Sequence, residues 1–208
     1  MAPDSIAQAA AALLAKRGRR LAYFTIAWNC LEGLFSVAAG AFAGSISLVG
    51  FGVDSFIEVA SASAVLWRFS GRAAGSHREK AALRFIGLCF LALAAYLIYE
   101  SAHDLVARQL PERSVPGIAV ACASLVAMPL LSRAKKRLGT QMGSQAVHAD
   151  ARQTDFCTWL SAILLAGLLL NALFGWWWAD PAAALLMVPL IAKEGIEGLR
   201  GETCDSCR

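Results

Sequence analysis

Charged residues are scarce in this sequence. Asp, Glu, Lys and Arg together make up 16% of its 208 residues, and hydrophobic residues make up 58%, whereas an ordinary soluble domain carries about 25% charged residues. Glycine-rich phosphate loops and nucleophile triads are also lacking. These absences argue against a soluble fold and against an enzyme, and they favour a membrane protein.

The hydrophobic residues gather into runs near the roughly 20 residues that a helix needs to cross a bilayer. Six spans are predicted, over residues 21–42, 45–67, 82–106, 115–131, 144–174 and 179–196. The sequence therefore predicts an all-α, polytopic membrane protein with a six-transmembrane-helix bundle. Residues 21–200 form this domain, between an N-terminal segment, 1–20, and a short tail, 201–208.

Nearly all basic residues fall on one side of the predicted bundle, in segments 16–20, 68–84, 133–137 and 193–208. The opposite side has only Arg108 and Arg113. Because short cytoplasmic loops keep an excess of positive charge, both termini are expected in the cytoplasm, with the chain in a plasma or inner membrane. Topology then explains the net charge of +4 without a nucleic-acid partner, although basic patches that bind anionic lipid are an alternative. Residues 1–14 place their basic neighbours after the apolar run, the reverse of a signal peptide, so no cleavage is expected.

Two carboxylates lie inside the second span. Asp54 and Glu58 are four residues apart, which places them on one helix face, and Asp54 is roughly 14 Å along the helix from Ser45. Carboxylates at this depth are costly and indicate function. Both stay ionised only with a cation between them, so a bound metal is predicted. The alternative is that they are protonated or paired with a basic side chain, for which Arg152 is the one intramembrane candidate.

The fifth span begins with further polar residues, His148, Asp150, Arg152 and Asp155. Asp155 is the better ligand candidate, because a long apolar run follows it and Asp150 lies closer to the basic loop. The alternative is that Asp155 pairs with Arg152 near the membrane boundary.

Glu32 lies halfway along the first span, three residues after Asn29. It is predicted either to accept a proton during transport or to make a hydrogen bond between packed helices. At the outer end of the third span, Glu100, His103 and Asp104 form either a metal vestibule or an ordinary hydrated helix end.

The cysteines divide into two groups. Those within the spans are expected to behave as small hydrophobic residues; they are Cys30, Cys89, Cys122 and Cys157. Cys204 and Cys207 form a CxxC motif in the tail, which supplies half of a four-thiolate zinc site. A redox pair and a reduced tail without function are the alternatives.

These motifs resemble the cation diffusion facilitators, a family of zinc and manganese efflux transporters. The resemblance rests on SISLVGFGVDSFIEVAS in the second span and on ADARQTDF…FGWWWADPAAALL across the fifth and sixth spans. It implies a homodimeric antiporter that exchanges a cytoplasmic divalent metal for external protons by alternating access. In that family the metal lies between the second and fifth helices, held by two acidic residues on one helix and by a His and an Asp on the other. Asp54 and Glu58 match the first pair and Asp155 matches the Asp.

The sequence departs from the family pattern where the His is expected. Ala151 occupies that position, so Asp150, His148 or the neutral Gln153 would have to supply the missing ligand. An oxygen-rich site favours manganese or iron over zinc. Arg208 follows the sixth span closely, so the family's cytoplasmic metal-binding domain is not expected, and dimerisation would rest on the membrane helices and the CxxC tail.

The leading hypothesis is efflux of a divalent metal cation by proton antiport, with zinc, manganese or iron as the substrate and no permanently bound cofactor. The alternative is a membrane metal-binding or assembly protein with a transporter-like fold that does not transport. A small oxidoreductase built on the CxxC motif has no further support in the sequence.

Overall fold

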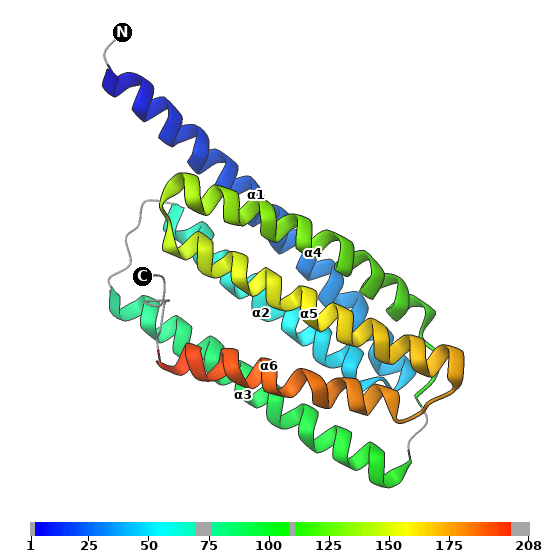
Figure 1. Cartoon of the computed structure of the whole chain (residues 1–208). Helices are drawn as coiled ribbons and strands as arrows, with labels where there is room; N and C mark the ends of the chain where they lie inside the picture. Colours follow the sequence, from blue (N-terminus) through cyan, green and yellow to red (C-terminus); the bar gives the residue numbers. More distant parts are fainter. Residues whose placement is uncertain (1–2, 70–75, 109–110, 201–208) are drawn as a thin grey trace.

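The computed structural model describes residues 3–69, 76–108 and 111–200, which fold into six α-helices joined by short connections (Figure 1). The helices are α1 (Pro3–Ala43), α2 (Ile46–Phe69), α3 (Ser76–Ala107), α4 (Val115–Met142), α5 (Gln145–Phe174) and α6 (Ala179–Arg200). The predicted all-α bundle is confirmed.

α1 and α4 extend furthest beyond the apolar runs from which they were predicted. α1 begins at Pro3, and its first turns project beyond the rest of the bundle (Figure 1). α4 continues past Leu131 to Met142, where Gly143 in the left-handed conformation, at φ 58°, ends it. Ala, Leu, Lys and Arg in both extensions are strong helix formers. Charge ends a membrane span without ending a helix, so the predicted start of α1 was too late and the predicted end of α4 was too early.

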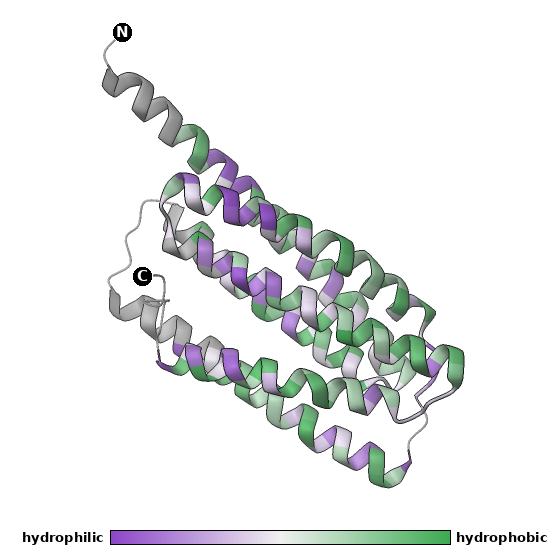
Figure 2. Ribbon diagram, viewed as in Figure 1, coloured by the Kyte–Doolittle hydropathy of each residue, from purple (hydrophilic) through white to green (hydrophobic). Residues whose placement is uncertain are grey.

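Five helices are long and apolar enough to cross a membrane, each along most of its length. These stretches are Ala12–Ala43, Ile46–Ser63, Gly87–Ala107, Val115–Met142 and Asp150–Phe174. α6 carries charged residues at both ends, which lowers its apolar content, but it packs along α3 within the same bundle. Most of the length of the helices consists of hydrophobic residues (Figure 2). Many large apolar side chains are exposed on the outer faces of the helices, where a membrane protein contacts lipid. The chain is a multi-pass membrane protein.

α2 lies at the centre of the bundle, in contact with α1, α3, α5 and α6. Its glycines allow this close packing. A Cβ atom on Gly52 would lie 2.8 Å from the backbone nitrogen of Val37 in α1, and one on Gly50 would lie 2.7 Å from the side chain of Leu97 in α3. Small residues let membrane helices approach in this way, so α2 presents its carboxylates to helices on several sides.

The start of α2 is fixed by a carboxylate from α6. Asp180 is buried and accepts hydrogen bonds from the hydroxyls of Ser45 (2.6 Å) and Ser47 (2.5 Å) and from the backbone N–H of Ile46 (2.8 Å). It also lies in the first turn of α6. The free N–H groups at a helix N-terminus attract negative charge, and Asp180 serves two such termini at once. This contact sets the position of α2 relative to α6.

Candidate metal site

Asp54 and Glu58 are fully buried on the face of α2 that meets α5. Asp54 Oδ2 accepts a hydrogen bond from the Cys157 thiol at 2.9 Å. Asp54 Oδ1 and Glu58 Oε2 have no hydrogen-bond partner among the described residues. Unpartnered buried carboxylate oxygens are costly, so these two atoms mark a position suited to a cation.

A buried lysine from α4 reaches the same region. The Lys135 ammonium lies 2.9 Å from Asp150 Oδ2 and 3.4 Å from Glu58 Oε1, and it donates to the hydroxyl of Thr154 at 2.8 Å. The Thr154 hydroxyl is also 2.6 Å from Glu58 Oε1. Lys135 is only 1% exposed. Helices α2, α4 and α5 therefore meet in one buried polar network.

This network corrects one expectation from the sequence. The predicted spans place Lys135 in a cytoplasmic loop, which leaves Arg152 as the one intramembrane basic residue able to pair with the carboxylates of α2. Because α4 continues as a helix, Lys135 is carried onto a buried face and pairs with Glu58, whereas Arg152 is exposed. Glu58 therefore has a basic partner that the predicted spans do not supply.

One face of α5 meets these groups. Asp150, Thr154, Cys157 and Ser161 recur every three or four residues along it, and all four are buried. Ser161 extends the polar stripe toward α4 by donating to the Ser124 hydroxyl at 2.9 Å. The spacing is that of one helix face, and it is readable from the sequence as a polar stripe in an apolar helix.

Asp155 lies off this stripe. It accepts a hydrogen bond from the hydroxyl of Ser132 and forms an ion pair with Lys136, and its side chain is 37% exposed. Successive residues of an α-helix point about 100° apart, so the neighbour of Thr154 cannot share its face. The structure does not bring Asp155 together with Asp54 and Glu58, and its basic partner is Lys136 rather than Arg152.

Glu32 approaches the network from α1. Its side chain is buried, and Oε2 accepts a hydrogen bond from the hydroxyl of Ser55, the residue after Asp54. Glu32 Oε1 and the Asn29 side-chain oxygen lack partners among the residues that the structure describes. Asn29 and Glu32 are both buried in the interior of the bundle.

Two other predicted ligands, His148 and Gln153, do not join the network in the part of the chain that the structure describes. The His148 ring packs over Gly139 of α4, where a Cβ atom would lie 3.1 Å from the ring. Gln153 is partly buried, and its side-chain nitrogen has no partner in the described part of the chain. Cys204 and Cys207 lie outside the described residues.

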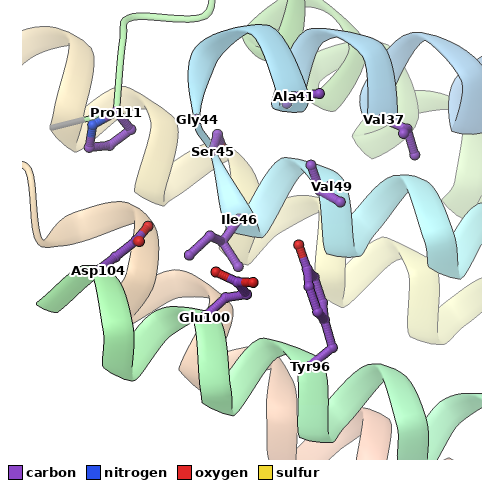
Figure 3. Close-up of a pocket in the computed structure, with 11 residues that line it drawn as sticks. Val37, Ala41, Gly44, Ser45, Ile46, Val49, Tyr96, Glu100, Asp104 and Pro111 are labelled. Atoms are coloured by element: carbon purple, nitrogen blue, oxygen red, sulfur yellow. The ribbon is translucent and has the colours of Figure 1, made fainter. Parts of the chain in front are cut away.

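A second polar cluster lies at the other predicted position, the outer end of α3. Ligand atoms of Glu100, His103 and Asp104 fall within 4.8 Å of one another. Glu100 and Asp104 point toward a pocket of about 370 Å³ between the start of α2 and α3, together with Tyr96 (Figure 3). His103 is exposed and bonds to Asp104 at 3.4 Å, an arrangement that a hydrated helix end explains equally well.

The charge balance of the buried network favours a cation. Glu32, Asp54, Glu58 and Asp150 all lie in or beside it, whereas Lys135 supplies the one ammonium found there among the described residues. Buried carboxylates require a counter-charge or a proton. The arrangement can therefore bind a cation between α2 and α5, with oxygen donors and one sulfur donor.

Comparison with known proteins gives a consistent picture. Residues 22–201 match the model of the cation efflux transmembrane domain. Transmembrane protein 163 of Xenopus laevis is 27% identical over 189 residues, covering 88% of this chain and 66% of that protein. An uncharacterised transporter of Synechocystis is 28% identical over 158 residues (72% and 51%), and one of Methanocaldococcus jannaschii is 28% identical over 178 residues (81% and 62%). The chain thus spans between 51% and 66% of the length of these relatives.

Proposed function

This chain belongs to the cation efflux family, and from that premise we propose that it transports a divalent metal cation across the membrane in exchange for protons. One observation carries the proposal: Asp54, fully buried between α2 and α5, has an oxygen without a partner among the described residues, and an unpartnered oxygen of Glu58 lies one turn away. Two relatives bear the name transporter.

In the proposed cycle the cation binds to Asp54 and Glu58 from the cytoplasm and leaves on the opposite side. Asp54 and Glu32 then carry protons back, because neither has a basic partner within the described residues. Glu58 and Asp150 have Lys135. The uneven distribution of basic residues supports cytoplasmic termini, and we propose a homodimer in a plasma or inner membrane.

The test is uptake by vesicles that contain the purified protein under an imposed pH gradient. Manganese, iron(II), zinc, cobalt and cadmium would each be offered, with protein-free vesicles as the blank and a protonophore to collapse the gradient. We expect saturable uptake that falls when the gradient is collapsed. If uptake is saturable but does not change when the gradient is collapsed, the protein transports the metal without exchanging it for protons.

A second function, metal binding or assembly without transport, is favoured by the ion pairs of Lys135, since they tie Glu58 and Asp150 together and restrain α2, α4 and α5 from moving apart. Stoichiometric binding of one of these metals without uptake would replace our proposal with this one.

The Cys157 thiol bears on the choice of metal. The sequence predicts only a small hydrophobic residue at this position, but its sulfur lies beside Asp54, and thiolate ligands favour zinc and cadmium over manganese. We expect Cys157→Ser to lower the ratio of zinc to manganese uptake on the order of tenfold. Cys89→Ser, a partly buried cysteine of α3, is the matched control and should leave the ratio unchanged. An unchanged ratio in Cys157→Ser would mean that the thiol is not a ligand.

A further inference from the structure

The position of Lys135 has a consequence for how the proposed site binds its ion. Its ammonium contacts Glu58 Oε1, Asp150 Oδ2 and the Thr154 hydroxyl. The ammonium therefore occupies one of the two oxygens of Glu58. A metal can bind both oxygens of this carboxylate only after Lys135 moves away. A metal at the unpartnered Oε2 would also repel an ammonium held at Oε1 of the same carboxylate, so the two cations compete for Glu58.

Lysine is suited to such an exchange. Its charge is compact and sits on a flexible four-carbon stem with rotatable donors, unlike the planar arginine fork. The two carboxylate contacts are also unequal, because the ammonium is nearer to Asp150 (2.9 Å) than to Glu58 (3.4 Å). Lys135 can give up Glu58 and keep Asp150.

We propose that Lys135 is a tethered competitor of the transported cation. This inference rests on the proposed function. The ammonium occupies Glu58 when the site is empty, is displaced toward Asp150 when the metal binds, and returns to Glu58 when the metal leaves. Lys135 thus weakens metal binding enough to permit release, and it neutralises Glu58 during the return of the empty carrier.

The first measurement is the Kd for Zn²⁺ and for Mn²⁺ of the purified full chain in detergent, by isothermal titration calorimetry. Lys135→Met removes the competitor, and we expect binding at least about tenfold tighter, which corresponds to about 1.4 kcal/mol. Lys136→Met is the matched control, since it removes the next lysine and its ion pair with Asp155 outside the network. If Lys135 acts only through the net charge of the protein, both variants will bind the metal more tightly by the same factor. That result would overturn the proposal.

A double variant tests the competition directly. If Lys135 and the metal compete for Glu58, Lys135→Met should raise metal affinity much less in a Glu58→Gln background than in the wild type. A purely structural role of Lys135 would give no such dependence on Glu58. A gain of the same size in both backgrounds would contradict the proposal.

Lys135→Met leaves buried carboxylates without their ammonium and can prevent folding. In that case Lys135→Met/Asp150→Asn, which removes both members of the closer ion pair, is compared with Asp150→Asn. We expect the double variant to bind Zn²⁺ more tightly; equal or weaker binding would overturn the inference about Lys135. The absence of metal binding by the wild type would instead overturn the proposed function itself.

Discussion

Asp54→Asn is expected to reduce metal uptake to the level of protein-free vesicles while the protein remains folded. The amide has nearly the same shape as the carboxylate and can still accept the hydrogen bond from Cys157, but it carries no charge to offset that of a divalent ion in a buried site. Initial uptake rates at several metal concentrations, with protein amount and thermal stability matched to the wild type, would measure the loss. Uptake at the wild-type rate would refute a role for Asp54 in transport.

Asp155→Asn is the informative companion to this variant. The family resemblance makes Asp155 a metal ligand, whereas the structure places it beside Ser132 and Lys136. We therefore expect Asp155→Asn to keep most of the uptake. A loss as complete as in Asp54→Asn would show that α5 rotates to bring Asp155 to the metal during the transport cycle.

Asp180→Ala is expected to cause the largest loss of stability. It removes the carboxylate that binds two hydroxyls and the backbone at the start of α2, leaving buried donors without a partner. The loss of a helix cap and of hydrogen bonds to a charged group should lower the free energy of unfolding by about 3 kcal/mol. For a chain of this size, this corresponds to a decrease of roughly 10 °C in Tm. Thermal unfolding in detergent, followed by circular dichroism, would measure it.

Asp104→Ala is the matched control, because Asp104 is also an outer-end aspartate but bonds only to His103 in the described part of the chain. We expect it to change stability by less than about 0.5 kcal/mol. Equal changes in Tm for the two variants would mean that the Asp180 contacts do not hold the start of α2.

Hydrophobic runs predicted the helices because their length is set by the bilayer, and the spacing of Asp54 and Glu58 predicted a shared helix face because the α-helix repeats every 3.6 residues. Both are local properties. The boundary of α4 was missed because charge was taken as the end of a helix. The polar stripe that contains Thr154 and Cys157 was present in the sequence, but the apolar run after Asp155 and the family pattern both favoured Asp155 as the ligand.

What the sequence determined by itself was therefore the all-α membrane class, the helices and the buried carboxylate pair of α2. The tertiary structure decided which groups face that pair: Lys135 from α4, Cys157 and Thr154 from α5, and not Asp155. It also decided that Asp180 binds the start of α2. These choices depend on the rotation and axial position of each helix against its neighbours. A single residue turns about 100° on its helix, so spacing along the chain cannot fix which side chains meet across an interface until the helices are packed.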